Sequence, residues 1–235
     1  MSERFAGQVA LVAGGTGGLG RGVSSEFLAE GATVVVTYRN EAELDALRAE
    51  VGANAARLEG RAVDVMDDGA VQQMVKGIVA KYGGLDAAVN CVGGYSAGSK
   101  LWDMKREVME QMLALNLQAG FVLLRAVVPA MLARDRGAIV NVASRAAIDH
   151  AGSAAAYAAS KSAAVAMIDS LAADLKDTNI RANSILPSII DTEANRKEMP
   201  KADFSKWPKP QEIARVILFL CSDDAKLIRG AAIPV

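Results

Sequence analysis

Tyr157 and Lys161 are the residues whose types and spacing in this sequence most directly indicate chemistry. Residues four apart lie on one face of a helix, so both side chains can reach the same small molecule. An unperturbed tyrosine has a pKa of about 10 and exchanges protons poorly at neutral pH, but an adjacent ammonium favours the phenolate. Ser144 ends an apolar run thirteen residues earlier, and Asn116 lies in a long helical segment before that run. We interpret these four as candidate catalytic residues that move a proton to or from an oxygen atom.

A second feature is the glycine-rich segment Gly14-Gly15-Thr16-Gly17-Gly18-Leu19-Gly20, which follows the first apolar run and opens a helical pattern. It fits both the G-x-G-x-x-G and the G-x-x-x-G-x-G spacing. Glycines let the backbone approach a pyrophosphate, and the helix N-terminus supplies N–H groups and partial positive charge. The alternative is a tight turn without a ligand. The position between a first strand and a first helix favours a dinucleotide-binding loop.

The end of the second predicted strand should discriminate between cofactors. An acidic residue there binds the ribose 2′-hydroxyl of NAD(H), whereas an arginine accepts the 2′-phosphate of NADP(H). The strand runs into Tyr38 and Arg39, and no acid appears before Glu41. Arg39 therefore favours NADP(H), with NAD(H) possible; the alternative is an arginine that is simply solvated at the surface.

The elements that must position these residues alternate between apolar β-rich runs and helical patterns. We predict strands at 9–13, 34–37, 62–65, 85–91, 138–143, 180–186 and 231–235. We predict helices from near 18, at 68–82, at 105–133 with an interruption near Pro129, at 153–176 and at 211–221. Such alternation implies right-handed crossovers. The predicted fold is α/β: one Rossmann domain over 1–235, with a doubly wound parallel sheet of about seven strands and helices on both faces.

The segment 188–210 is irregular and carries three prolines and many charges. Loops of that length in a compact domain are commonly functional lids. We predict a substrate lid there, with Met199, Phe204 and Trp207 as its apolar face; the alternative is that these three side chains simply pack on the domain.

Composition excludes several classes of function. Lys plus Arg number 26 and Asp plus Glu 27, so no strong field attracts nucleic acid or an anionic membrane. Cys91 and Cys221 lie in apolar runs, which predicts buried free thiols in a reducing cytosol. No signal peptide and no apolar stretch of membrane-spanning length is recognisable, so we expect a cytoplasmic protein. No Cys/His cluster suggests a metal, and the single histidine, His150, is expected at the surface near the substrate entrance.

Taken together, the motifs resemble the short-chain dehydrogenase/reductase family over nearly the whole chain. They occur in the family's order: the glycine segment 14–20, Asp64-Val65, Asn90-Cys91-Val92-Gly93, Asn116, Ser144, Tyr157 with Lys161, and Asn183 to Pro187 with Thr192. Two positions depart from the pattern. Ala13 stands where the family usually has a threonine whose hydroxyl ties the loop to the strand end near Asn90. Ser188 replaces a usual glycine and can stiffen the turn that faces the nicotinamide.

The resemblance implies how each residue acts. Tyr157 would protonate a carbonyl oxygen as hydride arrives from the nicotinamide, and Ser144 would stabilise the charge on that oxygen. Lys161 would hold the ribose hydroxyls, and Asn116 a water of the proton relay. Asp64 and Val65 would contact adenine; Asn90, Val92 and Gly93 would line the adenosine ribose and nearby backbone; Ile190 and Thr192 would meet the carboxamide. The full set of expected cofactor contacts is Gly14, Thr16, Gly18, Leu19, Gly20, Tyr38, Arg39, Asp64, Val65, Asn90, Val92, Gly93, Tyr157, Lys161, Pro187, Ile190 and Thr192.

The implied activity is hydride transfer between NADP(H) or NAD(H) and a small carbonyl or alcohol substrate, as in 3-oxoacyl-thioester reductases or related ketone reductases. A local similarity of 191–207 to the dihydropteridine reductase type of this family offers pterin reduction as an alternative, against which Ser144 and Arg39 argue. A non-catalytic dinucleotide-binding protein is a third possibility, which the intact Ser144, Tyr157 and Lys161 disfavour.

The resemblance also implies a homo-oligomer, a tetramer or a dimer. It would be built on the helix from 105 and on the helix that carries Tyr157, whose small residues include Ala163, Ala164, Ala166 and Ala172.

Overall fold

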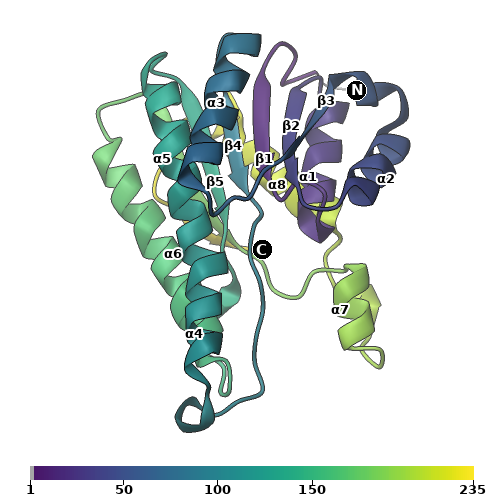
Figure 1. Ribbon diagram of the computed structural model, residues 1–235, viewed down its shortest axis with the longest axis vertical. Coiled ribbons are helices and arrows are strands. Elements are labelled where there is room, and N and C mark those ends of the chain that lie inside the picture. Colours follow the sequence, from purple (N-terminus) through teal and green to yellow (C-terminus); the bar gives the residue numbers. More distant parts are fainter. Residues whose placement is uncertain (1–2) are drawn as a thin grey trace.

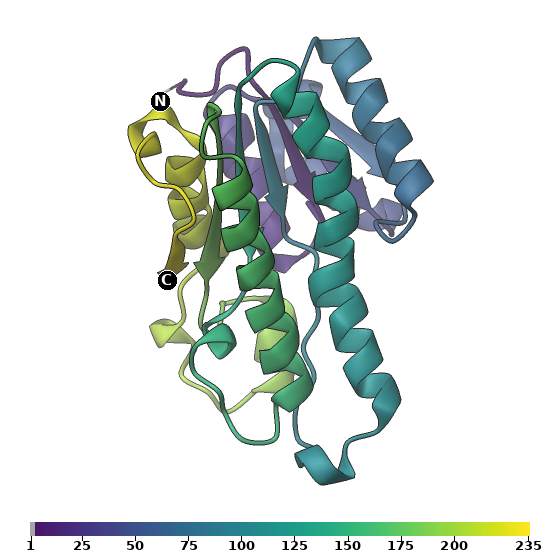
Figure 2. The same cartoon turned by 90° about the vertical axis from the view of Figure 1, so that its left-hand side faces the viewer.

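The computed structural model describes residues 3–235 and contains one seven-stranded parallel sheet in the order β3-β2-β1-β4-β5-β6-β7, with helices on both faces (Figures 1 and 2). The predicted fold class is therefore confirmed. The strands are β1 Val9–Ala13, β2 Thr33–Tyr38, β3 Leu58–Ala62, β4 Ala87–Asn90, β5 Gly137–Val142, β6 Ile180–Leu186 and β7 Ala232–Pro234.

Eight α-helices complete the fold. They are α1 Gly18–Ala29, α2 Glu41–Val51, α3 Asp68–Tyr82, α4 Arg106–Leu113, α5 Ala119–Leu132, α6 Ala155–Asp174, α7 Glu193–Glu198 and α8 Pro210–Cys221. Buried side chains of α1, α2 and α8 form one apolar core against the sheet, and those of α3, α5 and α6 form the other. Alternate residues of each strand serve the two cores: Val12 belongs to the first and Leu11 to the second. This two-sided burial explains why the central strands are continuous apolar runs.

The third strand was predicted wrongly at 62–65. It lies at Leu58–Ala62 and pairs with β2 from Val34↔Leu58 to Tyr38↔Ala62. As an edge strand it carries Glu59 and Arg61 in place of an apolar run, so periodicity does not reveal it. Glu59 Oε2 accepts there from the Lys81 ammonium at 2.7 Å and from the Tyr82 hydroxyl at 2.6 Å.

Helix α2 is an element that the sequence analysis missed. Its N-cap is Asn40, whose side chain accepts a hydrogen bond from the Ala42 N–H at 3.0 Å. Only Leu44 and Leu47 of this helix are buried, so the apolar stripe is narrow and easily overlooked.

The long predicted helix is continuous over Arg106–Leu132, but its irregular turn is not where we expected it. Pro129 lies inside α5, whereas a π-helical turn interrupts the helix at Ala114–Gln118 and carries Asn116. Single π turns recur at functional sites. Among the described residues this is the one helix long and apolar enough to cross a membrane by composition, yet half of its most apolar stretch is buried. We interpret it as a core helix of the domain.

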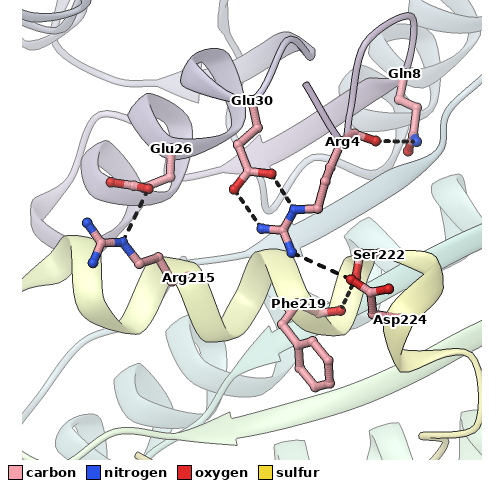
Figure 3. Close-up of polar contacts among 8 residues, drawn as sticks. All are labelled: Arg4, Gln8, Glu26, Glu30, Arg215, Phe219, Ser222 and Asp224. Carbon is pink, nitrogen blue, oxygen red and sulfur yellow. Dashed lines mark hydrogen bonds and ion pairs between the residues drawn. The ribbon is translucent and has the colours of Figure 1, made fainter. Parts of the chain in front are cut away.

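Ion pairs join the N-terminal segment to the adjacent helices (Figure 3). The Arg4 guanidinium donates two hydrogen bonds to Glu30, at 2.5 and 2.6 Å, and lies 3.9 Å from Asp224. Arg215 of α8 lies 3.6 Å from Glu26 of α1. Such surface pairs contribute little individually, so the apolar packing of α1 against α8 dominates this contact.

Arg181 is a buried cation that ties β6 to the end of α8. Its guanidinium donates to the backbone carbonyls of Leu220 at 2.6 Å, Ala225 at 3.1 Å and Ser222 at 3.0 Å. Burial lowers its pKa. The carbonyls stand where the chain leaves α8 to form β7, so one side chain satisfies three backbone acceptors that β-pairing cannot reach.

Replacing Arg181 with methionine should destabilise the protein, because it leaves these carbonyls buried without donors. We expect a loss of about 3 kcal/mol in the free energy of unfolding, measured by urea denaturation. Arg229→Met is the matched control: this exposed arginine also donates to backbone carbonyls, of Thr178 and Ile180. It should cost less than about 1 kcal/mol, since water can replace its bonds. Equal losses in both variants would contradict this account of Arg181.

Candidate active site

The parallel register gathers the candidate residues at one edge of the sheet. Ala13 pairs with Asn90, and Asn90 pairs with Asn141, so the C-terminal ends of β1, β4 and β5 stand side by side. The loops that follow these strands are the glycine segment, residues 91–105 and the turn at Ser144. Ligands of open α/β sheets bind at this edge.

The glycine segment allows β1 and α1 to approach closely. Gly14 has a φ of +71°, and a Cβ at Gly20 would lie 2.1 Å from the Gly14 carbonyl oxygen. A Cβ at Gly15 would lie 2.4 Å from Val36 of β2. Helix α1 has no side-chain cap and no acidic residue in its first turn, so no side chain of the helix start occupies its first N–H groups. These features fit a pyrophosphate held by backbone N–H groups.

Thr37 supplies the tie that Ala13 lacks. Its hydroxyl accepts a hydrogen bond from the Gly14 N–H at 2.8 Å. Thr37 is buried at the end of β2, the strand beside β1. The loop is thus anchored from a neighbouring strand, and the sequence analysis missed this residue. The sequence shows Thr37 only as a polar residue next to the apolar run of this strand. That pattern does not reveal that its hydroxyl binds the Gly14 N–H.

Thr16 and Glu43 connect the glycine segment to α2. The Thr16 hydroxyl donates to Glu43 Oε2 at 2.9 Å, and Thr16 is 7% exposed. Thr16 was an expected cofactor contact, whereas Glu43 was not among the expected residues. Sequence spacing could not pair them, because α2 itself was missed.

The residues expected to distinguish the cofactors lie beside this loop. The Tyr38 hydroxyl donates to Glu41 Oε2 at 3.0 Å. Arg39 is exposed, and within residues 3–235 it is the one arginine whose side chain makes neither an ion pair nor a hydrogen bond. Asp64 and Val65 follow β3, and the Asp64 carboxylate accepts from the Met66 N–H at 2.9 Å. The predicted bounds of β3 were wrong, but Asp64 and Val65 still lie just after the C-terminal end of this strand.

The Lys161 side chain is buried from water near the C-terminal end of β5. It is 5% exposed, and its ammonium donates to the carbonyl oxygen of Val142, the last residue of β5, at 3.0 Å. Burial lowers its pKa to about 8. A Cβ at Gly93 would stand 3.0 Å from Lys161 Nζ and 2.8 Å from Asn116 Oδ1. Gly93 must therefore lack a side chain for both groups to keep these places.

Asn116 joins the loop after β4 to helix α6. Its amide accepts from the Gly94 N–H at 2.9 Å and donates to the Gly94 carbonyl at 3.1 Å. The same Nδ2 donates to Ser160 Oγ at 3.0 Å, and Ser160 donates to the Tyr157 carbonyl at 2.8 Å. Asn116 is 2% exposed, so this network is sheltered from water. Met112, Gly94 and Ser160 were absent from the expected set.

Tyr157 is partly buried, and this burial raises its pKa, an effect that the nearby Ser144 side chain opposes. We expected the Lys161 ammonium to lower that pKa, and this was wrong: removal of water dominates, and the ammonium is directed to the Val142 carbonyl. Tyr95, also missed as a neighbour, lies edge-on to Tyr157, with ring centroids 4.9 Å apart and planes at 79°. The electrostatic interaction with Tyr95 raises the Tyr157 pKa further.

Ser144 stands where β5 ends and a short turn begins. Its hydroxyl oxygen accepts from the Ala146 N–H at 3.1 Å, and the following Arg145 N–H donates to the Pro187 carbonyl at 3.0 Å. Asn90, another expected contact, donates to Asn141 at 2.9 Å and accepts from the Val92 N–H at 3.2 Å. These bonds fix the strand ends against one another.

The predicted lid is an ordered excursion after β6. Thr192 accepts from the Asn195 N–H at 3.3 Å as the N-cap of α7, and a Cβ at Gly18 would lie 2.8 Å from its methyl carbon. This segment therefore begins over the N-terminus of α1. Below the sheet in Figure 1, α7 stands apart from α4. Phe204 and Trp207 pack together at 5.0 Å, with the Arg196 guanidinium 4.9 Å from the Phe204 ring.

The structure also gives the burial of the remaining residues singled out in the sequence. Ile190 packs partly against the first core, and Leu19 is buried in it. Burial raises the pKa of both Cys91 and Cys221 to about 12, as expected for unreactive thiols. His150 is exposed, with Nε2 3.2 Å from the Ala147 carbonyl oxygen.

Comparison with known proteins identifies the family. A family model described as short chain dehydrogenase matches residues 8–203. The chain belongs to this family. It is 32% identical to a 3-oxoacyl-(acyl-carrier-protein) reductase of Thermotoga maritima, over 99% of this chain and 97% of that protein. It is 33% identical to a D-threitol dehydrogenase of Mycolicibacterium smegmatis, over 97% of this chain and 91% of that protein.

Solved structures of the family share the fold closely. ElxO with NADP bound has a TM-score of 0.91 and 25% identity, over 97% of this chain and 96% of that chain. An NAD⁺-bound xylitol dehydrogenase has a TM-score of 0.91 and 26% identity, over 98% of both chains. The curated relatives named above are dehydrogenases and reductases, and this short-chain dehydrogenase is an oxidoreductase.

Removing the Asn116 side chain should free the loop that it holds. In Asn116→Ala, the Gly94 N–H loses its acceptor, so we expect amide hydrogen exchange at Gly94 and Tyr95 to accelerate by about tenfold or more. Mass spectrometry of the peptide that contains them measures this. Ser160→Ala is the control, since it leaves the Asn116–Gly94 bonds in place and should barely change the rate. Unchanged exchange in Asn116→Ala would show that other contacts hold the loop.

Proposed function

We propose that this protein is a reductase or dehydrogenase that interconverts a carbonyl and an alcohol with NADP(H) as its preferred cofactor and NAD(H) as a possible one. The observation that carries the proposal is the buried Lys161, one helical turn after Tyr157, at the same sheet edge as Ser144 and the glycine segment. A proton donor, an oxygen-binding hydroxyl and a dinucleotide cradle are the parts that carbonyl reduction needs.

The expected residues fit a nicotinamide dinucleotide. Backbone N–H groups at 14–20 would hold the pyrophosphate, Asp64 and Val65 the adenine, and Asn90, Val92 and Gly93 the adenosine side. Ile190 and Thr192 would border the carboxamide, and Pro187 would also contact the cofactor; all three follow β6, and Thr192 lies against Gly18 at the N-terminus of α1. When bound, the cofactor supplies a hydride.

Arg39 supports the preference for NADP(H). It is exposed at the end of β2 and makes no contact with an acid within the described residues, so its guanidinium is available for a 2′-phosphate. The related structures contain NADP in one case and NAD⁺ in the other, so either cofactor is accommodated by this fold.

The side chains divide the proton chemistry between them. Tyr157 holds its proton at neutral pH because burial raises its pKa, and it can donate that proton to a carbonyl oxygen. The Ser144 hydroxyl lies beside Tyr157 and would donate to the same oxygen as negative charge develops on it. Lys161 is cationic below pH 8 and would hold ribose hydroxyls. Asn116, which binds Gly94 and Ser160, would complete a relay through water.

The substrate would be a small carbonyl compound, a ketone or a 3-oxoacyl thioester, as the names of the relatives suggest. Ser144 favours such a substrate over a pterin, because its hydroxyl is matched to a single oxygen atom. A non-catalytic role is disfavoured, since the dry environment of Tyr157 and Lys161 destabilises the charged forms without benefit to folding.

A cytoplasmic homo-oligomer is the proposed form of the enzyme. Phe121 of α5 is 50% exposed and Leu132 46% exposed, which leaves apolar surface uncovered on the helix expected at the interface. Ala163 and Ala166 of α6 also reach the surface, whereas Ala164 is buried within the protomer. Figure 2 shows α6 beside the α4–α5 helix, so the two can form one continuous face.

Tyr157→Phe should lower turnover by about 10³-fold, because the ring remains but the transferable proton is gone. The dissociation constant for NADPH, measured by fluorescence titration, should change less than about twofold. Tyr82→Phe is the matched control, since its hydroxyl binds Glu59 far along the chain from the site. Turnover of a verified substrate within a few-fold of the parent would refute the role of Tyr157.

The pH profile of carbonyl reduction should fall above about pH 8, the pKa of Lys161. A lysine is cationic below its pKa and neutral above it, so the ribose and the carbonyl lose a nearby positive charge as pH rises. Tyr157 stays protonated through that range because its pKa is raised. Initial rates measured across about pH 6 to 10 would show this fall. A flat profile to pH 10 would contradict the requirement for a positive charge at Lys161.

A further inference from the structure

We propose that Glu43 is a second cofactor-discriminating residue, which favours NAD(H) and opposes the preference for NADP(H) set by Arg39. The inference rests on the proposed function, because it concerns the same dinucleotide site. It follows from the contact between the Glu43 carboxylate and the Thr16 hydroxyl.

Glu43 is placed by the start of α2. The helix begins directly after Arg39 and Asn40, and its first turn contains two acids, Glu41 and Glu43. They point to different partners. Glu41 accepts from the Tyr38 hydroxyl at 3.0 Å, whereas Glu43 reaches the glycine segment and accepts from Thr16 at 2.9 Å.

The gap that Glu43 spans is the place where the adenosine ribose would lie. In this fold the ribose 2′ position is read from the end of β2, and the phosphates from the loop after β1. Glu43 bridges these two structures through Thr16. Its carboxylate is exposed and makes no ion pair among residues 3–235, so its negative charge is uncompensated by the protein.

Chemistry separates the two cofactors at this carboxylate. The ribose of NAD(H) presents a hydroxyl at the 2′ position that can donate to Glu43. NADP(H) presents a phosphate there. This group is negatively charged and largely deprotonated at neutral pH, so it cannot donate a hydrogen bond to the carboxylate. The Thr16 hydroxyl has one proton, which it gives either to Glu43 or to a phosphate oxygen. A phosphate therefore meets both repulsion and a donor that is already engaged.

Arg39 acts in the opposite sense, since it is exposed and free to bind the 2′-phosphate. Two opposed charges, a few residues apart, then set the ratio of the two affinities. The protein should accept both cofactors, with a smaller preference for NADP(H) than Arg39 alone would produce.

The test is to measure dissociation constants for NADH and NADPH by calorimetry with the full-length chain. Glu43→Gln removes the charge but keeps an oxygen that can accept from Thr16. We expect NADPH to bind about fivefold more tightly and NADH about twofold more weakly, as for a partly screened charge a few ångströms from the phosphate. Glu41→Gln is the matched control, because it neutralises an acid of the same turn that is turned toward Tyr38.

A second variant separates the charge from the contact. Thr16→Val keeps the Glu43 charge and removes the hydroxyl that binds it, so the ratio of the two dissociation constants should stay near that of the parent, without the shift seen in Glu43→Gln. Far-UV circular dichroism and thermal melting confirm that each variant is folded.

The inference is overturned if the parent binds both dinucleotides and Glu43→Gln leaves the ratio of the two constants unchanged, or shifts it no more than Glu41→Gln does. In that outcome the proposed function stands. If the parent binds neither dinucleotide at millimolar concentration, the proposed function itself fails, and the discriminating role of Glu43 fails with it.

Discussion

The site depends on one constraint: a lysine ammonium must be kept almost dry at the end of a central strand. Lys161 meets it by donating to the Val142 carbonyl, whose strand ladder ends at that residue. Burial without an anionic partner is unfavourable to the charged form, so the pKa of Lys161 falls to about 8 and the ammonium loses its proton above that pH. Any side chain at Gly93 would displace it.

The surroundings of Lys161 follow from this constraint. A π-helical turn brings Asn116 close enough to hold both backbone groups of Gly94, and the same amide reaches Ser160 on the helix that carries Tyr157. One side chain thus sets the distance between a loop and a helix. The arrangement is rigid because every partner is buried or backbone, which suits groups that must exchange a proton over a fixed distance.

The loop after β4 and the segment after β6 carry fewer structural constraints than Lys161 and its neighbours. The loop after β4 is held at Gly94 and again at Gly98, whose N–H donates to the Ser153 carbonyl at 2.8 Å. Ser153 has a φ of +63°, a conformation that costs energy for a residue with a side chain and often marks a functional turn. Between these anchors Tyr95 is 60% exposed beside Tyr157. Its ring and the segment that begins at Thr192 can vary without disturbing Lys161.

Strand–helix alternation and the order of the motifs suffice to predict the fold class, which the sheet confirms, and to name four candidate catalytic residues. Strand–helix alternation implies that strand ends meet at one edge, so Ser144, Tyr157 and the glycine segment had to converge. Only the tertiary structure decided which contacts they make there. Thr37 replaces the tie missing at Ala13, Glu43 reaches Thr16 from a helix with a narrow apolar stripe, and β3 lies at a polar edge. The direction of the Tyr157 pKa was likewise decided by burial. Local sequence patterns indicate which residues face a core. The pKa of a buried group depends instead on desolvation and on nearby charges, and these are set by residues that are distant in the sequence.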